Sequence, residues 1–522
     1  MKIFNIKLMS LIVCFVFSNI TLAQFSVKEF DQYVDAVMKS FEVPGISVAI
    51  VKEGKVILAK GYGRKKMGEN IPVDENTLFN IASNTKAFTA TALAILVEEG
   101  KLEWEKPVIN YLPSFRLSNP YVTDELTVKD LLVHRSGLGL GAGDLLWWPA
   151  STYNRKEIVH RLQFIPLENS FRNTYAYDNV LYLVAGELIE AVTDSSWEDF
   201  IYTRILKSVE MRNSRVRVSD ILRESNVASP HAKINEEVKP ITPFTSDNTN
   251  PAGGILSNAV DMARWMIVQL DSGRLANGGR LFSPQTTRQL WTIVTPIPIG
   301  EPPPNMTHLR ANFNGYALGF VVRDYLGKKM LTHTGGMPGY VSRVTLLPEL
   351  KLGISILTNQ ESGNAFNALT YYVLDKYINA KKFDWVKELK NLEVRFDSIS
   401  KAAEKSLYAE RDTNSRPSLP LAKYMGTYRD SWYGEVVIKF EDDKPVIKFS
   451  NTPSLYGDLI HWQYDTFIAR WRDRELRADA FVTFYLDPDG SIEEVKMRAV
   501  SPETDFSFDF HDLLLKPVHS KK

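Results

Sequence analysis

The sequence predicts an α+β protein, in which an antiparallel sheet is flanked by helices and joined to a mainly helical subdomain, followed by a small all-β, barrel-like domain. Three observations predict this fold class. A strand-like hairpin lies near the N-terminus, and a strand-like meander lies at 316–358. Mixed helix and loop separates the two. After a Pro/Ser-rich break, short strand-like runs recur with turns between them.

The first domain begins with a helix and a hairpin. Apolar residues recur with helical spacing over 26–40. Ile46–Val51 and Lys55–Gly61 are strand-like and are joined by a Glu-Gly turn, which predicts a hairpin. Residues 87–97 are apolar apart from two threonines, so they predict a helix buried on all sides. Gly100 is suited to end that helix.

The later meander has short connections, so its strands are expected to pair antiparallel and to share one sheet with the hairpin. Its strand-like runs are Tyr316–Val322, Lys329–Thr334, Val341–Leu347 and Gly353–Thr358. Residues 362–410 then predict helix that becomes more charged toward its end.

Ser415–Pro420 predicts a linker, because prolines and serines break regular structure there. Regularly spaced short strands beyond it predict an all-β barrel or sandwich. These runs are Tyr433–Phe440, Pro445–Phe449, Tyr464–Trp471, Phe481–Leu486 and Ile492–Arg498. We therefore expect a first domain over 24–380, a helical segment and linker over 381–421, and an all-β domain over 422–522.

The N-terminus has the layout of a cleavable export signal. Lys2 and Lys7 precede the apolar run Leu8–Phe17, and small and polar residues follow as far as Ala23. The run is about half of the ~20 residues that a membrane span requires. Residues 1–23 are therefore predicted to be a signal peptide. The mature chain is predicted to have no transmembrane segment and to be periplasmic or secreted.

Composition excludes several classes of function. Hydrophobic residues make up 44% and charged residues 24%, which is typical of globular domains. The net charge is zero, and removal of the leader with its two lysines leaves about −2, so no nucleic-acid partner is expected. Cys14 is the only cysteine and lies in the leader. The histidines form no H-E-x-x-H pair, so no metal site is expected. The sequence has no Walker or dinucleotide motif, and no cofactor is expected.

The motif Ser83-Asn-Thr-Lys86 has the spacing of a nucleophile and its base. An offset of three residues puts both side chains on one helical face. Ser83 opens the buried helix, where free backbone N–H groups favour developing negative charge. Burial would lower the pKa of Lys86 and let it act as a base. Ser398-Ile-Ser-Lys401 repeats the pattern, but in a charged helix with no partner motif after it.

The second motif is Tyr177-Asp-Asn179, in a loop before an apolar helix. Tyr177, as a phenolate held by Lys86, would take the serine proton and pass it to the leaving group. Asn179 would hydrogen-bond the amide of the substrate. Two rival motifs are Ser246-Asp-Asn248 and Tyr377-Ile-Asn379, and a structural role is the alternative for Tyr177.

The third motif, His333-Thr-Gly335, ends a predicted strand. Gly335 and Gly336 would let a substrate backbone come close. The N–H of Gly336, together with that of Ser83, is a candidate oxyanion hole. His333 and Thr334 would bind a carboxylate or donate into the Tyr177 network.

In this order the three motifs resemble those of the serine β-lactamase and penicillin-binding-protein superfamily. They are most similar to the class C β-lactamase-like branch, with its D-alanyl-D-alanine carboxypeptidases, D-aminopeptidases and esterases. Leu126–Leu138, Asp144–Trp148 and Pro251–Gly254 also resemble segments of that branch, over roughly 26–380. Residues 422–512 resemble an uncharacterised β domain that often follows such hydrolase domains. The implied fold is that of β-lactamases and transpeptidases.

The resemblance implies that Ser83 is the acylated nucleophile and that Lys86 and Tyr177 are its base network. It also implies that Asn179, His333 and Thr334 bind substrate or steer protons. Typical class C β-lactamases carry lysine at the position of His333, which favours peptide or ester hydrolysis here.

The resulting prediction is an exported serine hydrolase, a peptidase of the D-amino-acid or carboxypeptidase type. Its partner is a peptide or small-molecule substrate, such as a D-amino-acid or peptidoglycan-derived peptide, a β-lactam or an ester. An esterase or β-lactamase of the same fold is the alternative among enzymes. A penicillin- or peptidoglycan-fragment-binding sensor without turnover is the alternative of another class. The all-β domain is expected to shape the cleft or to mediate oligomer assembly.

Overall fold

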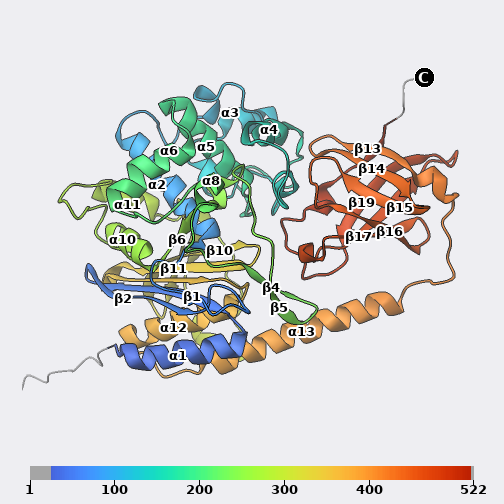
Figure 1. Ribbon diagram of the computed structural model, residues 1–522. Helices are drawn as coiled ribbons and strands as arrows, with labels where there is room; N and C mark the ends of the chain where they lie inside the picture. Colours follow the sequence, from blue (N-terminus) through green and yellow to red (C-terminus); the bar gives the residue numbers. More distant parts are fainter. Residues whose placement is uncertain (1–24, 519–522) are drawn as a thin grey trace, which may run out of the picture.

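The computed structural model describes residues 25–518, so the predicted signal peptide lies outside the described residues. The chain forms a larger α+β domain and a smaller β domain, joined by one long helix (Figure 1). This is the predicted fold class. Within 25–518, no helix is both long enough and apolar enough to cross a membrane.

An eight-stranded antiparallel sheet forms the centre of the larger domain, in the order β2-β1-β12-β11-β10-β9-β8-β7. The early hairpin and the late meander share this sheet, as predicted, because β1 pairs with β12. The strands are β1 (Gly45–Lys52), β2 (Lys55–Gly63), β7 (Thr295–Pro296), β8 (Asn314–Tyr316), β9 (Val321–Tyr325), β10 (Lys328–Met337), β11 (Tyr340–Leu347) and β12 (Leu352–Thr358).

One predicted strand proves to be two. The sequence pattern over 316–322 predicts a continuous strand, whereas the chain turns back between β8 and β9. Gly319 has φ +79° at this turn. The N–H of Ala317 donates to the carbonyl of Phe320, 2.8 Å away. A left-handed residue inside an apolar run is not visible as a break in periodicity, which explains the error.

Helices cover both faces of the sheet. On one face, α1 (Val27–Phe41) and α12 (Gly363–Ile378) pack together with the start of α13 (Trp385–Ala409), at the bottom of Figure 1. The other face contacts α10 (Ala259–Leu270) and carries the mainly helical part of the domain.

The helical part is built around α2 (Thr85–Glu98) and α5 (Val180–Thr193), which pack against each other. Every residue of α2 from Thr85 to Leu96 is buried, as predicted for a helix that is apolar on all sides. The remaining helices are α3 (Pro120–Glu125), α4 (Arg155–Arg161), α6 (Trp197–Phe200), α7 (Lys207–Val209), α8 (Val218–Ile221), α9 (Asn250–Gly253) and α11 (Pro284–Leu290).

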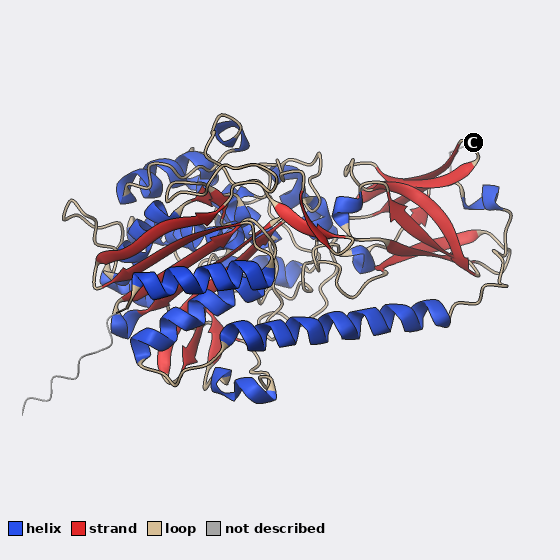
Figure 2. Cartoon of the chain, turned by 60° about the horizontal axis from the view of Figure 1, so that its bottom comes forward, coloured by secondary structure: helices blue, strands red, loops and turns tan. Residues whose placement is uncertain are grey.

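The second domain is an eight-stranded antiparallel barrel that is nearly closed, in the order β19-β18-β17-β16-β15-β14-β13-β20. A bridge between Val495 and Leu515 joins its two ends. Figure 2 shows α13 running from the first domain toward this barrel. The strands are β13 (Gly426–Asp430), β14 (Gly434–Glu441), β15 (Lys444–Phe449), β16 (Tyr456–Gln463), β17 (Thr466–Trp471), β18 (Ala480–Leu486), β19 (Ile492–Ala499) and β20 (Lys516–Pro517). Three of these strands, β13, β16 and β20, are not among the strands predicted from the sequence.

Candidate active site

Ser83 lies in a tight turn that leads into α2. The turn is a 3-10 helix, η1 (Ala82–Asn84), and Thr85 begins the α-helix immediately after it. Ala82 has φ +47°, a left-handed conformation that costs a non-glycine residue free energy. The N–H of Ala82 donates to Asn80 Oδ1 at 2.6 Å, which stabilises this conformation. The strained turn packs against β10, and Ser83 lines a cavity beside that strand.

Lys86 contacts the Ser83 hydroxyl directly. Its Nζ lies 3.0 Å from Ser83 Oγ, and it also donates to Asn179 Oδ1 at 2.7 Å and to the carbonyl of Ala252 at 2.9 Å. The side chain is fully buried, and this burial lowers the pKa of Lys86 to about 7. Neutral Lys86 is therefore abundant at physiological pH, and it is in hydrogen-bond reach of the proton that a serine nucleophile must lose.

Tyr177 lies beside the same pair, but it is not the resting base. Lys86 Nζ is 5.0 Å from the centre of the Tyr177 ring. Burial raises the pKa of Tyr177 well above 10, although its hydrogen bond with Ser83 acts in the opposite direction. This shift disfavours the expected Tyr177 phenolate in the resting site, because the expectation took no account of the desolvation of the half-buried ring. Tyr177 therefore lies beside Ser83 and Lys86 as a neutral phenol.

Asn179 was expected to bind substrate, yet both ends of its side-chain amide are already used. Its Oδ1 accepts from Lys86, and its Nδ2 donates to Asp144 Oδ2 at 2.9 Å. The side chain is 5% exposed and is one of the residues that line the cavity. Asn179 therefore orients Lys86 and links it to a buried carboxyl group.

Asp144 and Asp178 are fully buried near Lys86, and burial raises the pKa of each to about 7. Asp144 accepts from Trp147 Nε1 at 2.8 Å in addition to Asn179. The charge of the Lys86 ammonium opposes the effect of burial on both carboxyl groups. Lys86 and two buried carboxyl groups thus form a single electrostatic cluster beside Ser83.

His333 is buried at 5% exposure, and its ring is held on both sides. Nδ1 lies 2.6 Å from the carbonyl of Thr334, and Nε2 lies 2.8 Å from the hydroxyl of Tyr316. Since a carbonyl only accepts, Nδ1 carries the proton and Nε2 accepts from Tyr316. Burial lowers the pKa of His333 to about 3, so the ring is neutral and offers no cation to a substrate carboxylate.

The two glycines of the third motif have different roles. A Cβ on Gly335 would lie 2.3 Å from the carbonyl of Ile81, so only glycine lets β10 come this close to the nucleophile turn. A Cβ on Gly336 would meet nothing within 4 Å, because this residue faces open space in the cavity. Thr334 is exposed in the same cavity. The edge of β10 thus forms one wall beside Ser83, with Gly336 as the candidate oxyanion-hole donor.

A cavity of about 310 Å³ contains Ser83 and is rich in aromatic side chains. It brings together Ser83, Tyr177, Asn179, His333, Thr334 and Gly336 from the three predicted motifs. The remaining lining residues are Leu140, Trp147, Trp148, Tyr175, Thr249, Ala252, Gly253, Tyr316, Val321, Met337, Asp505, Phe506 and Ser507. The last three belong to the second domain.

Several residues of this site have no sequence signal that predicts their role. Asp144 was noted only as part of a resembling segment, and Asp178 only as the middle of a motif. His134 packs between the rings of Tyr177 and Tyr316, with ring centres 4.3 and 4.4 Å away. A single buried histidine or aspartate has no local pattern, so only the tertiary structure identifies these residues.

The rival motifs are not part of this cavity. Lys401 of the second S-x-x-K pattern is exposed on α13 and pairs with Glu236 at 2.8 Å. Tyr377 and Asn379 lie at the end of α12, on the far side of the sheet. Neither Ser246 nor Asn248 lines the cavity.

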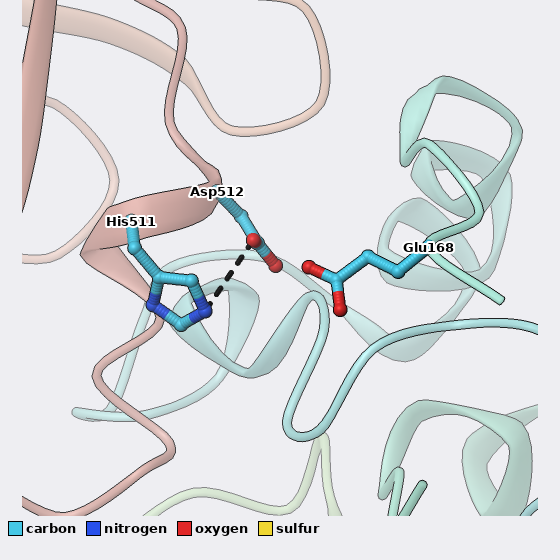
Figure 3. A group of neighbouring side chains, drawn as sticks. All are labelled: Glu168, His511 and Asp512. Atoms are coloured by element: carbon cyan, nitrogen blue, oxygen red, sulfur yellow. Dashed lines mark ion pairs between the residues drawn. The ribbon is translucent and has the colours of Figure 1, made fainter. Parts of the chain in front are cut away.

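Three metal-binding side-chain types meet elsewhere, across the domain interface. Glu168 of the first domain faces His511 and Asp512 of the second (Figure 3), and their ligand atoms lie within 4.8 Å of one another. Glu168 and His511 are exposed, and none of the three lines the Ser83 cavity. We assign no ion to this group.

The fold and the Ser-Lys-Tyr arrangement define the class of serine hydrolases that work through an acyl-enzyme. Comparison with known proteins agrees. A sequence model of the β-lactamase family matches residues 30–377, and the chain belongs to that family, within the serine β-lactamase and penicillin-binding-protein superfamily. Residues 410–517 match a domain of unknown function (DUF3471).

Relatives include the unguisins hydrolase ungD' of Aspergillus campestris. It is 28% identical over 486 residues, which is 89% of this chain and 88% of the relative. Protein flp of Staphylococcus aureus is 26% identical over 374 residues, 70% of this chain and 69% of flp. An octameric penicillin-binding protein homologue from Pyrococcus abyssi has the same fold, with a TM-score of 0.60 at 20% identity over 94% of this chain and all of that one. D-amino acid amidase from Ochrobactrum anthropi has a TM-score of 0.56 at 20% identity, over 67% of this chain and 100% of that one.

Proposed function

We propose that this protein is an exported serine hydrolase that forms an acyl-enzyme at Ser83 and cleaves amide bonds next to D-amino acids. The observation that carries the proposal is the 3.0 Å contact between Ser83 Oγ and the Nζ of a buried lysine whose pKa is about 7. Export rests on the layout of residues 1–23 alone.

The chemistry follows from the positions of the side chains. Neutral Lys86 takes the hydroxyl proton as Ser83 Oγ bonds to the carbonyl carbon of the substrate. The N–H groups of Ser83 and Gly336 stabilise the oxyanion. Tyr177, adjacent to both Ser83 and Lys86, gives its phenol proton to the leaving nitrogen as the C–N bond breaks and takes the proton held by Lys86, which is neutral again. Water then attacks the ester and loses a proton to Lys86, and this proton passes to the Ser83 oxygen as its bond to the acyl carbon breaks.

The wall of the cavity favours one substrate type over another. None of the residues lining the Ser83 cavity is an arginine or lysine, and His333 is neutral. A carboxypeptidase binds the free carboxylate of its substrate, and such a group is held best by a cation. This arrangement therefore favours an amidase- or aminopeptidase-like substrate, or an internal amide bond, over the carboxypeptidase type. Aromatic walls suit an apolar side chain on the acyl part.

The relatives support hydrolysis rather than binding without turnover. The relative that matches 89% of this chain is named as a hydrolase of unguisins. In this chain Ser83, Lys86 and Tyr177 lie next to one another. Every side chain that the proposed acylation and deacylation steps use is therefore present.

The test is intact-protein mass spectrometry of the mature chain with four probes: a D-phenylalanine amide, a D-Ala-D-Ala peptide, a fluorescent penicillin and a p-nitrophenyl ester. The matched control is Ser83→Ala. We expect a Ser83-dependent adduct that decays with product release, fastest for the D-amino-acid amide. Fastest turnover of the ester or the penicillin would instead assign an esterase or a β-lactamase. An adduct that persists without product would indicate a sensor, and equal labelling of Ser83→Ala would refute the nucleophile.

A further inference from the structure

A loop of the second domain reaches into the active site. It lies between β19 and β20, and three of its residues, Asp505, Phe506 and Ser507, line the same cavity as Ser83. The Phe506 ring meets the Tyr177 ring edge-on, with centres 6.2 Å apart. A Cβ on Gly141 would lie 2.8 Å from this phenyl ring, so the missing side chain of Gly141 lets the Phe506 ring pack against the first domain. The cavity wall is therefore shared between the two domains.

Ser507 is hydrogen-bonded to the electrostatic cluster beside Ser83. Its Oγ donates to Asp144 Oδ2 at 2.9 Å, the same oxygen that accepts from Asn179 Nδ2 at 2.9 Å. Asn179 Oδ1 in turn accepts from Lys86 Nζ at 2.7 Å. All four side chains are 5% exposed or less. A continuous buried chain of hydrogen bonds thus leads from the second domain to the base.

A second contact fixes the turn that carries Asp144. Asp509, also fully buried, accepts from the backbone N–H of Gly143 at 2.7 Å and from that of Leu145 at 2.9 Å. These two N–H groups flank Asp144 in the chain. The loop therefore holds both the backbone and the side chain of Asp144, and this arrangement leaves the Asp144 carboxylate little freedom to rotate away from Asn179.

We propose that Ser507 of the second domain is a positioning residue of the active site, which holds Lys86 against Ser83 through Asp144 and Asn179. The proposal rests on the proposed acyl-enzyme function. It predicts that acylation depends on a residue outside the hydrolase domain. Displacement of a catalytic group by about 1 Å can cost on the order of 10²-fold in rate, so loss of the Ser507 hydroxyl is expected to slow acylation by roughly ten- to a hundredfold.

The experiment compares full-length wild type with Ser507→Ala, Ser507→Thr and Asn451→Ala. Asn451 is the matched control, because its Nδ2 donates to Tyr153 Oη at 2.7 Å across the same domain interface, outside the Ser83 cavity. The readouts are the acylation rate constant with a p-nitrophenyl ester, KM, and the melting temperature. We expect Ser507→Ala to lower the rate constant with little change in KM. Ser507→Thr, which keeps a hydroxyl, should restore most of it, and Asn451→Ala should acylate at the wild-type rate.

Two results would overturn the proposal. One is a wild-type rate constant for Ser507→Ala. The other is an equal loss of rate in Asn451→Ala, which would mean that domain docking in general, and not this hydroxyl, is required. If Ser507→Ala does not fold, Ser507→Cys takes its place, since a thiol is a weaker donor and an intermediate rate is expected.

Failure of the proposed function is a separate outcome. It would appear as no Ser83-dependent adduct in the wild type with any probe. The crystal structure of Ser507→Ala still tests the positioning role in that case. Movement of Asn179 Oδ1 away from Lys86 Nζ supports the role, and an unchanged contact overturns it.

Discussion

Replacing Lys86 by methionine should stabilise the protein at neutral pH and lose that advantage as the pH rises. Burial lowers the pKa of Lys86 from 10.5 to about 7. At about 1.4 kcal/mol per pKa unit, keeping this side chain protonated in the folded state costs about 5 kcal/mol. Methionine has similar length and no charge, so Lys86→Met removes this cost. The lost hydrogen bonds to Asn179 and Ala252 offset part of the gain.

The pH dependence of the free energy of unfolding separates the cost of the buried charge from the other effects of the substitution. Between pH 7 and the unfolded-state pKa, the folded protein has released the Lys86 proton and the unfolded chain still holds it. The unfolded state then binds more protons, so the free energy of unfolding of the wild type rises with pH. Relative to Lys86→Met, the wild type should gain about 2 to 3 kcal/mol from pH 7 to pH 9. Removing the ammonium also raises the pKa values of Asp144 and Asp178 in Lys86→Met. The variant therefore loses more stability than the wild type as the pH rises, which further increases the gain of the wild type relative to the variant.

The measurement is the free energy of unfolding from urea titrations of both proteins at pH 7, 8 and 9. Lys401→Met is the matched control, since Lys401 belongs to the other S-x-x-K pattern, is exposed, and has its pKa raised rather than lowered by Glu236. Its difference from wild type should stay constant over this range. If the free energies of unfolding of Lys86→Met and wild type change equally from pH 7 to pH 9, Lys86 is not a desolvated base and the reasoning is refuted.

Further predictions concern the same site. Acylation should accelerate as pH rises through about 7, because only neutral Lys86 accepts the proton of Ser83; a pH-independent rate constant would contradict this role. Tyr177→Phe should slow acylation by an amide substrate by roughly 10²- to 10⁴-fold with an unchanged melting temperature, and near wild-type rates would exclude Tyr177 as the proton donor to the leaving nitrogen. Gly335→Ala should destabilise the fold by about 1 to 3 kcal/mol, because its Cβ would lie 2.3 Å from a backbone oxygen. Gly336→Ala, which meets no atom within 4 Å, should melt at the wild-type temperature.

Much of the fold follows from local patterns. The period of the apolar residues identified α1, the hairpin and most strands of the meander, because each has one face or all faces buried. The linker and the regular turns predicted the separate β domain. Two of the three missed strands are short: β20 has two residues, and β13 has five and follows a 3-10 turn, whereas β16 has eight residues and was missed despite its length.

The candidate site was predictable only as far as its residues share a short motif. Ser83 and Lys86 are one helical turn apart, so their contact follows from helix geometry. Asp144 lies 35 residues from Asn179 and 363 residues from Ser507 in the chain. Contacts over such separations depend on packing of the whole molecule. The same limit explains why the phenolate was expected, since the sequence does not reveal how far the Tyr177 ring is desolvated.

The electrostatics of Lys86 support the proposed role of the second domain. Asp144 and Asp178 oppose the effect of burial on the pKa of Lys86, and a buried carboxylate exists only if donors replace the water it has lost. Asp144 has three such side-chain donors, from Trp147, Asn179 and Ser507. One of the three belongs to the second domain. Weakening of that contact would favour the neutral form of Asp144 and remove part of the charge that balances Lys86. The serine, its lysine and the contact between the two domains are therefore parts of one electrostatic unit.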